Sequence, residues 1–265
     1  MAVSKQDALA ALRGTFPILE PGHVWLAGAG PGDPGLVTLD ALAGLTQADV
    51  VVHDALVDKR VLALANSDAR LEFAGKRGGK PSPTQADISK RLIALAREGC
   101  RVLRLKGGDP NVFGRGGEEA LALAGAGIPF RVIPGVTAGL AALASAAIPA
   151  TMRHINQALI LATGQGAADE DGLDWAALAR TGEPMVIYMA MHNLPQIVAA
   201  IEGGGLACDT PVAVIAAATT AQERILVSRL DRVVAEAQAA GMEPPAIVVV
   251  GEIVRMRERI RGEKS

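Results

Sequence analysis

The stretch VWLAGAGPGDPGLVTLDALAGLTQADVVVH, residues 24–53, decides the fold class. It begins with a short apolar run at Val24–Ala27, passes through a loop rich in Gly and Pro, and continues with helical spacing over Leu36–Ala48. A second apolar run, Val50–His53, follows directly. Short β-type runs that alternate with helices predict an α/β sheet that binds ligands at the carboxyl ends of its strands.

The same alternation extends along the rest of the chain. Thr84 opens a helix that stops at Gly99, with Asp87 at the fourth position of a capping box. The other predicted strands are Arg101–Leu105, Ile128–Ile133, Ala158–Thr163, Met185–Met189, Val212–Ile215 and Ile247–Val250, and the other predicted helices are Gly116–Ala126, Asn193–Glu202 and Asp231–Ala240. The pattern breaks near Pro134–Ile148 and begins again, which predicts an N-terminal arm over 1–20, two α/β domains over 21–135 and 136–255, and a charged tail over 256–265.

Composition argues against several classes of protein. Half of the 265 residues are apolar but only 3% are aromatic, so the cores are expected to consist of Ala, Val, Leu and Ile. The net charge of −2, from 26 Lys and Arg against 28 Asp and Glu, disfavours a general nucleic-acid binder. The two cysteines lie far apart, so neither a metal site nor a disulfide is expected, and a reducing cytoplasm fits. No apolar run approaches the ~20 residues that span a bilayer, and the N-terminus lacks the apolar region of a secretory signal.

The loop Gly28–Gly35 follows the first predicted strand but lacks the dinucleotide fingerprint. The third glycine of G-x-G-x-x-G would be residue 33, which is Asp33, and two prolines remove N–H donors that a pyrophosphate needs. A second glycine loop, Gly107–Pro110, follows the strand at Arg101–Leu105. Glycines let a ligand approach the main chain closely, but a tight turn explains the first loop as well, and Asp109 either binds a ligand or caps a turn.

Two segments closely resemble the characteristic segments of the tetrapyrrole methylases: GAGPGDPGLVTLDALAGLTQADVVVHDALV (Gly28–Val57) and VLRLKGGDPNVFGRGGEE (Val102–Glu119). Further segments match in the same order: GKRGGK (Gly75–Lys80), IPGVTAG (Ile133–Gly139), VIYMA (Val186–Ala190) and PPAIVVVGEIV (Pro244–Val254). The resemblance implies the class III methyltransferase fold of that family, with two α/β domains and the cofactor in the inter-domain cleft.

The branch of the family that these segments resemble most methylates uroporphyrinogen III. The resemblance therefore implies C-methylation that depends on S-adenosyl-L-methionine, at two pyrrole carbons (C2 and C7), to give precorrin-2 and S-adenosyl-L-homocysteine in cobalamin or sirohaem biosynthesis. It also implies a homodimer. From the cysteine usage and the net charge we expect a cytoplasmic protein with no nucleic-acid partner, and neither a metal nor a membrane partner is expected. Three alternatives stay open: another precorrin C-methyltransferase, a nicotinamide-dependent oxidoreductase, and a non-catalytic cofactor-binding protein.

The resemblance also implies a role for individual residues. Asp54 matches the proton acceptor of the family and Lys76 the proton donor. Cofactor contacts are implied for Pro31, Gly107, Gly108, Asp109, Val112, Thr137, Ala138, Met189 and Ala218, with Ala246 as a further candidate. The segment over 216–222, AAATTAQ, departs from the family, whose members carry a charged and glycine-containing stretch before the Thr, so its local shape is an open question.

A tetrapyrrole with many carboxylates needs cations in its binding site. The candidates for substrate binding lie in the matching segments Gly75–Lys80 and Val102–Glu119 and are Arg77, Lys80, Arg104, Lys106 and Arg115, with Met152–His154 as a weaker addition. Some of these cations are expected to be ordinary solvated surface charges. His53 is expected to pack rather than to pair with Asp54, because adjacent strand residues point to opposite faces.

Overall fold

The structure is a computed structural model, and it describes residues 11–12, 14–75, 84–166 and 172–262. The chain divides into two compact units, Met1–Thr137 (unit 1) and Ala138–Ser265 (unit 2). Each unit contains its own sheet, so the predicted α/β class is confirmed. In the described residues, no helix has both the length and the apolar character that a membrane span requires.

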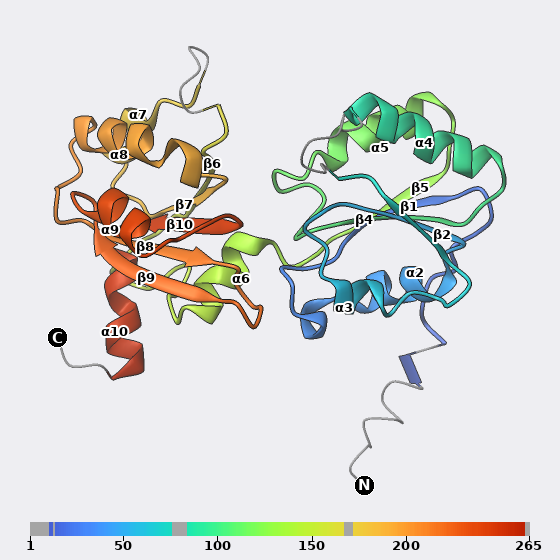
Figure 1. Ribbon diagram of the computed structural model, residues 1–265, viewed down its shortest axis with the longest axis horizontal. Helices are drawn as coiled ribbons and strands as arrows, with labels where there is room; N and C mark the ends of the chain where they lie inside the picture. Colours follow the sequence, from blue (N-terminus) through green and yellow to red (C-terminus); the bar gives the residue numbers. More distant parts are fainter. Residues whose placement is uncertain (1–10, 13, 76–83, 167–171, 263–265) are drawn as a thin grey trace, which may run out of the picture. The chain divides into compact units, whose positions relative to one another are not determined.

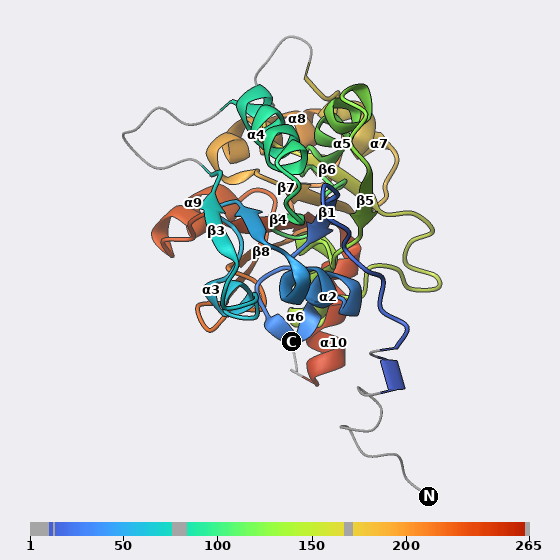
Figure 2. The same cartoon turned by 90° about the vertical axis from the view of Figure 1, so that its right-hand side faces the viewer.

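Unit 1 alternates strands and helices as predicted. Its elements are β1 (Val24–Gly28), η1 (Pro34–Leu36), α2 (Leu39–Gln47), β2 (Val50–His53), α3 (Lys59–Leu62), β3 (Arg70–Phe73), α4 (Gln85–Arg97), β4 (Val102–Lys106), α5 (Gly116–Gly125) and β5 (Phe130–Ile133). The strands pair in parallel in the order β3-β2-β4-β1-β5. Helices α4 and α5 cover one face of this sheet and α2 and α3 cover the other (Figures 1 and 2). The central strands β1, β2 and β4 are therefore buried on both faces, as their continuous Val and Leu runs predict.

Capping residues decide where the helices of unit 1 begin. The side chain of Asp33 accepts a hydrogen bond from Gly35 N at 2.8 Å and starts the short helix η1, so α2 begins only at Leu39, after its cap Thr38. The capping box of α4 is confirmed: Thr84 Oγ1 accepts from Asp87 N at 3.2 Å, and Asp87 Oδ2 accepts from Thr84 N at 3.0 Å.

The predicted N-terminal arm is wrong at its last residues. Leu19 is fully buried in the core of unit 1. Its N–H donates to Gln47 Oε1 at 3.0 Å, and its carbonyl accepts from Arg101 Nε at 3.0 Å. The domain therefore begins before residue 21, because an apolar side chain and two hydrogen bonds hold this segment on the sheet and α2.

Unit 2 has a mixed sheet rather than a second run of parallel strands. Its elements are α6 (Ala138–Ser145), β6 (Ile160–Thr163), α7 (Trp175–Arg180), β7 (Met185–Tyr188), η2 (Met191–Asn193), α8 (Leu194–Gly203), β8 (Pro211–Ala216), β9 (Arg224–Arg229), α9 (Val233–Ala239), β10 (Ala246–Val250), η3 (Glu252–Arg255) and α10 (Met256–Arg261). The strand order is β6-β7-β10-β8-β9, and only β6 and β7 pair in parallel.

The strands β3 and β9 and the helices α3, α6 and α7 were not predicted. Arg224 and Arg229 bracket β9, and its side chains are half-buried or exposed. This strand lies at the edge of the sheet, where partial exposure weakens the apolar pattern on which sequence prediction depends.

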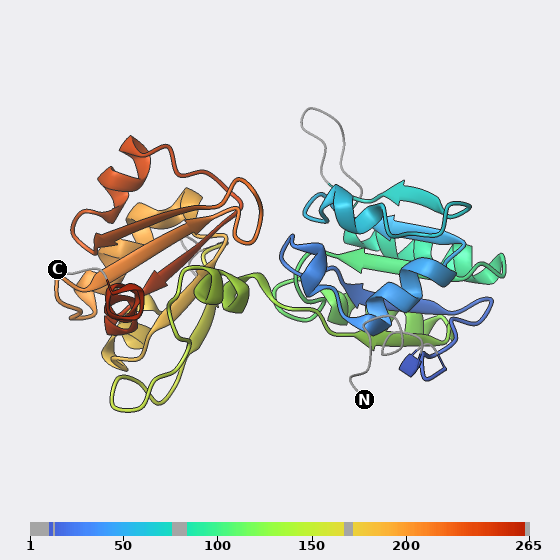
Figure 3. The same ribbon diagram turned by 90° about the horizontal axis from the view of Figure 1, so that it is seen from below.

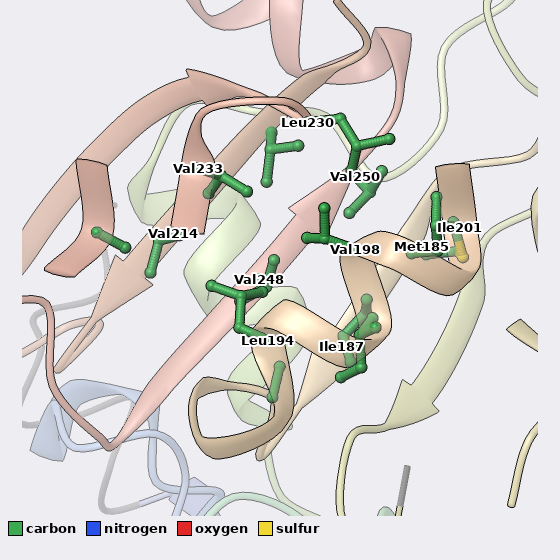
Figure 4. Packing of buried hydrophobic residues seen from close by; sticks show 14 of the residues in the cluster. Met185, Ile187, Leu194, Val198, Ile201, Val214, Leu230, Val233, Val248 and Val250 are labelled. Atoms are coloured by element: carbon green, nitrogen blue, oxygen red, sulfur yellow. The ribbon is translucent and has the colours of Figure 1, made fainter. Parts of the chain in front are cut away.

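Aliphatic side chains fill the core of unit 2. Side chains of β7, β8 and β10 meet those of α8 and α9 in one cluster, in which Met185, Ile187, Val214, Val248 and Leu194 are buried (Figure 4). Helix α6 lies on the opposite face of the sheet, in front of the strands in Figure 3. This composition agrees with the expectation of an interior made of aliphatic residues.

Candidate active site at the strand ends

At the centre of the unit 1 sheet, the chain turns to one face of the sheet after β1 and to the opposite face after β4. The two strands are parallel neighbours, but the chain continues from β1 to α2 on one face and from β4 to α5 on the other (Figure 1). In open α/β sheets, ligands bind beside the strand ends at such a switch point. Both predicted glycine loops begin here, which makes this edge the candidate site.

Main-chain hydrogen bonds join the two glycine loops. Gly108 N donates to Gly30 O at 2.7 Å and Gly30 N donates to Gly108 O at 3.2 Å. A Cβ on Gly28 would lie 2.5 Å from Gly108 O, and a Cβ on Gly135 would overlap the same oxygen. These glycines therefore let the loops approach one another, a packing role that the sequence analysis did not foresee.

Asp109 ties the second glycine loop to the end of β5. Its Oδ1 accepts from Asn111 N at 2.8 Å, and its Oδ2 accepts from Gly135 N at 3.0 Å. Both carboxylate oxygens thus hold the main chain, as in the turn-capping alternative of the sequence analysis. Because each oxygen has a second lone pair, this arrangement leaves acceptor capacity on the carboxylate.

Asp54 lies at the end of β2 and contacts the loop that follows β4. Its Oδ1 accepts from Leu56 N at 2.9 Å and its Oδ2 accepts from Gly107 N at 3.3 Å. The side chain is half-buried, so two N–H groups orient a carboxylate that still reaches solvent. His53 instead packs its ring edge-on against Phe73, with centroids 5.6 Å apart. An ionised, oriented carboxylate at a strand end suits an acceptor of protons.

The structure places two of the predicted substrate-binding cations in a buried cluster. Arg104 is 2% exposed and Lys106 is 4% exposed, and their side chains converge on Glu119, which is fully buried. Glu119 Oε1 accepts from Arg104 Nε at 3.1 Å, from Lys106 Nζ at 3.0 Å and from Gln85 Nε2 at 2.8 Å. We call these four residues the Glu119 cluster. Because the cluster engages and buries both cations, we correct the expectation that Arg104 and Lys106 contact substrate carboxylates directly.

Glu119 was missed by the sequence analysis although it ends the quoted segment GRGGEE. It lies in the first turn of α5, where the partial positive charge of the helix end stabilises a carboxylate. Its position next to Glu118 was the only signal, and it did not reveal which of the two faces the sheet. The structure shows that Glu119 is buried and that Glu118 is exposed.

Arg115 remains exposed at the start of α5. It has a left-handed backbone, with φ 61°, and its Nε donates to Glu118 Oε1 at 2.9 Å. This hydrogen bond lowers the pKa of Glu118 below its ordinary value. A left-handed backbone is uncommon for a residue with a side chain and is often found at functional sites. Within the described residues, the predicted substrate cations that remain exposed are Arg115 and, in the weaker candidate Met152–His154, Arg153.

In unit 2, the predicted cofactor contacts Ala138 and Met189 flank one hydrogen bond. The hydroxyl of Tyr188, the last residue of β7, accepts from Gly139 N at 3.0 Å. A Cβ on Gly139 would overlap this hydroxyl, so α6 begins directly against the end of β7. Met189 follows with a left-handed backbone, φ 53°, and is 46% exposed. Tyr188, the single tyrosine of the chain, was missed by the sequence analysis.

The segment that departs from the family forms a tight turn after β8. Ala217 and Thr219 have φ of 49° and 67°, a conformation that glycine adopts more readily. Glu223 Oε2 holds this turn by accepting from Thr219 N at 2.7 Å. Ala218 is half-buried at its centre, and Ala246 is buried on the neighbouring strand β10.

The remaining predicted site residues divide into two groups. Pro31 and Val112 are half-buried in the two loops, and Thr137 is buried just before α6. Lys76, Arg77 and Lys80 lie outside the described residues.

Comparison with known proteins gives a consistent match. The family described as Tetrapyrrole (Corrin/Porphyrin) Methylases matches residues 23–234. A uroporphyrinogen-III C-methyltransferase of Sinorhizobium sp is 56% identical over 244 residues, which are 91% of this chain and 87% of that protein. A siroheme synthase of Zymomonas mobilis is 47% identical over 88% of this chain, which spans only 49% of that longer relative. The crystal structure of a uroporphyrin-III C-methyl transferase from Thermus thermophilus complexed with S-adenyl homocysteine has a TM-score of 0.75 and 38% identity, and the match covers 88% of this chain and 99% of that chain.

Proposed function

The chain belongs to the tetrapyrrole methylases, and from this premise we propose that it is a methyltransferase that uses S-adenosyl-L-methionine and acts on uroporphyrinogen III. It methylates two pyrrole carbons, C2 and C7, and the product is precorrin-2. The observation that carries this proposal is the 56% identity to a uroporphyrinogen-III C-methyltransferase over nearly the whole of both chains. The carboxylate of Asp54 beside the joined glycine loops supports it.

The residues at the strand ends fit the methyl donor. In the joined glycine loops Gly107 is half-buried and thus keeps part of its main chain accessible, and Met189 offers exposed apolar surface for an adenine ring. When bound, S-adenosyl-L-methionine supplies an electrophilic methyl group on a sulfonium. The residues proposed to hold it are Pro31, Gly107, Gly108, Asp109, Val112, Thr137, Ala138, Met189, Ala218 and Ala246.

Asp54 is proposed to accept the proton that the cationic ring system loses after methylation of a pyrrole carbon. The N–H groups of Leu56 and Gly107 fix its carboxylate, and the remaining lone pairs can take the proton. An ionised carboxylate also stabilises the positive charge that develops on the ring during methyl transfer. Lys76 is proposed to return a proton to the macrocycle.

The carboxylates of the substrate are proposed to meet Arg115, Arg77 and Lys80. Each charge-assisted hydrogen bond contributes about 1.5–3 kcal/mol, so a few such contacts give tight binding. Arg104 and Lys106 are not included, because Glu119 buries them.

Incubation with uroporphyrinogen III and S-adenosyl-L-methionine tests the proposal. We expect a dimethylated tetrapyrrole and two equivalents of S-adenosyl-L-homocysteine for each product molecule, measured by mass spectrometry and chromatography. Assays with other precorrins run beside it. Methylation of one of these, with none of uroporphyrinogen III, would reassign the substrate within the family.

We also propose that the protein is a homodimer in the cytoplasm and has no nucleic-acid or membrane partner. The family resemblance supports the dimer, and the net charge of −2 supports the absence of nucleic-acid binding. Light scattering on the purified protein tests the dimer. A mass equal to one chain at all concentrations would contradict it.

A further inference from the structure

The Glu119 cluster carries an excess of positive charge inside unit 1. Arg104 and Lys106 contribute two cations against the single carboxylate of Glu119, and all three side chains are at most 4% exposed. Glu119 Oε2 has no hydrogen-bond partner among the described residues. Apolar side chains of the same volume often stabilise a fold as well as, or better than, buried ions. Packing alone therefore does not account for a lysine at this position.

The main chain at Lys106 connects the parts of the candidate site. Lys106 is the last residue of β4, and its carbonyl accepts from Ala29 N in the first glycine loop at 2.7 Å. The next residue, Gly107, donates its N–H to Asp54 Oδ2. The side chain of Lys106 meanwhile points to Glu119 on α5. Lys106 thus contacts the first glycine loop and the buried cluster directly, and it is linked to Asp54 through the adjacent Gly107.

The surroundings of Lys106 act on its ammonium in both directions. Desolvation, followed by the positive charge of Arg104, lowers the pKa of Lys106 below its ordinary value. The charges of Glu119 and Asp54 and the hydrogen bond to Glu119 act in the opposite direction. The cation at Lys106 is therefore coupled to Asp54 by charge as well as through the main chain.

We propose that Lys106, anchored on Glu119, is a positioning residue for Asp54. Its buried ion pair fixes the main chain at Lys106 and Gly107, so that the Gly107 N–H keeps the Asp54 carboxylate in one orientation for proton transfer. This inference rests on the proposed function for the role of Asp54. It differs from that function in assigning a task to the buried pair of Lys106 and Glu119, which is not among the residues proposed to bind the substrate or the methyl donor.

The variant Lys106→Met tests this assignment in the full chain. It leaves Arg104 and Glu119 as a balanced pair, so the protein is expected to fold and to bind S-adenosyl-L-homocysteine as the parent does. We expect kcat to fall by about tenfold or more while KM for uroporphyrinogen III stays within about twofold, because a misplaced catalytic group affects the rate rather than binding. We also expect hydrogen exchange at residues 107–109 to rise about tenfold, because the loop loses its anchor.

A matched control and a second variant sharpen the experiment. Lys90→Met makes the same change at an exposed position of α4 and is expected to leave kcat and hydrogen exchange at the parent values. Glu119→Gln keeps the shape of the anchor but removes its charge, and is expected to give the pattern of Lys106→Met. Parent values of kcat and of loop exchange in a folded Lys106→Met or Glu119→Gln protein overturn the proposal. If the parent chain itself does not methylate uroporphyrinogen III, the proposed function fails, and the exchange difference between Lys106→Met and Lys90→Met still decides whether Lys106 anchors the loop.

Discussion

Three glycines, Gly28, Gly108 and Gly135, meet where β1, β4 and β5 end, and the main chain of one occupies the space that a Cβ on another would need. This contact connects residue type to site geometry directly. Alanine at Gly28 or Gly135 forces two strand ends apart, because main-chain atoms cannot rotate away as a flexible side chain can. The loops that carry the proposed cofactor contacts would separate with them.

We expect Gly135→Ala to lower the free energy of unfolding by about 1–3 kcal/mol, the usual cost of overpacking. It should also weaken binding of S-adenosyl-L-homocysteine, measured by calorimetric titration beside denaturant unfolding. Gly117→Ala is the control: it lies in α5 with no atom within 4 Å of the added Cβ, and is expected to be neutral or stabilising. A Gly135→Ala protein as stable as the Gly117→Ala protein would show that the loops tolerate the methyl group.

At Asp54, we expect Asp54→Asn to lower kcat by about 10²–10⁴-fold, the range for loss of a general acid or base. Affinity for S-adenosyl-L-homocysteine should stay near the parent value, since the amide oxygen can still accept a hydrogen bond from a main-chain N–H. Steady-state kinetics and calorimetry measure the two effects separately. Asp58→Asn is the control, because Asp58 caps α3 nearby and Asn caps a helix equally well. Equal turnover in the two variants would refute a catalytic Asp54.

At the level of secondary-structure elements, one carboxylate joins strand β3 to helix α4. Glu72 on β3 accepts from Arg91 on α4, at 2.9 Å from Nε and 2.8 Å from Nη2, and it also pairs with Arg70 Nε at 2.8 Å. The hydrogen bonds from Arg91 are the largest cause of a lowered pKa of Glu72. Because β3 is an edge strand with partly exposed side chains, this ion pair supplements a small apolar contact.

The sign of the pH effect follows from the lowered pKa of Glu72. The ionised carboxylate contributes its full stability above the unfolded pKa, near 4.3, and loses it as the pH falls through the lower folded pKa. We expect Glu72→Gln to be less stable at pH 7 by up to about 1 kcal/mol, given the partial exposure of the pair. The difference should vanish in acid below the folded pKa. Hydrogen exchange of α4 in the parent and in Glu72→Gln, at pH 7 and at an acid pH below the folded pKa, measures this difference in stability. A difference of the same size at both pH values would contradict the assignment to Glu72.

At the scale of the molecule, three apolar clusters among the described residues each lie within one unit. One consists of residues 162–250 and lies within unit 2, whereas two others consist of residues between 19 and 133 and lie within unit 1. A unit that contains its own core has what it needs to fold alone. The proposed site residues, in contrast, come from both units, with Asp54 in unit 1 and Met189 in unit 2.

We therefore expect residues 1–137 and 138–265, produced as separate chains, each to unfold cooperatively. Trp25 reports on the first and Trp175 on the second, because each unit contains one of the two tryptophans. Neither chain alone should methylate uroporphyrinogen III, since each holds only part of the proposed site. Loss of the cooperative transition in either fragment would show that its core depends on the other unit.

Features that depend on local pattern were predictable from the sequence. The alternation around residues 24–53, the capping box of Thr84 and Asp87, and the glycine loops at two strand ends predicted the α/β class and the edge where the candidate site lies. The quoted segments also indicated the family, which the comparison with known proteins confirmed. These features are readable because helix caps, turns and apolar periodicity involve residues that are near neighbours in the chain.

Features that depend on contacts between residues distant in the sequence became visible only in the folded structure. It paired β9 with β8 in an antiparallel edge, although no periodic signal marked that strand. It turned Arg104 and Lys106 inward to Glu119, where the sequence analysis expected cations facing the substrate. A charged residue in a sequence does not reveal where its side chain points, because packing determines which carboxylate lies near it and whether water can reach it.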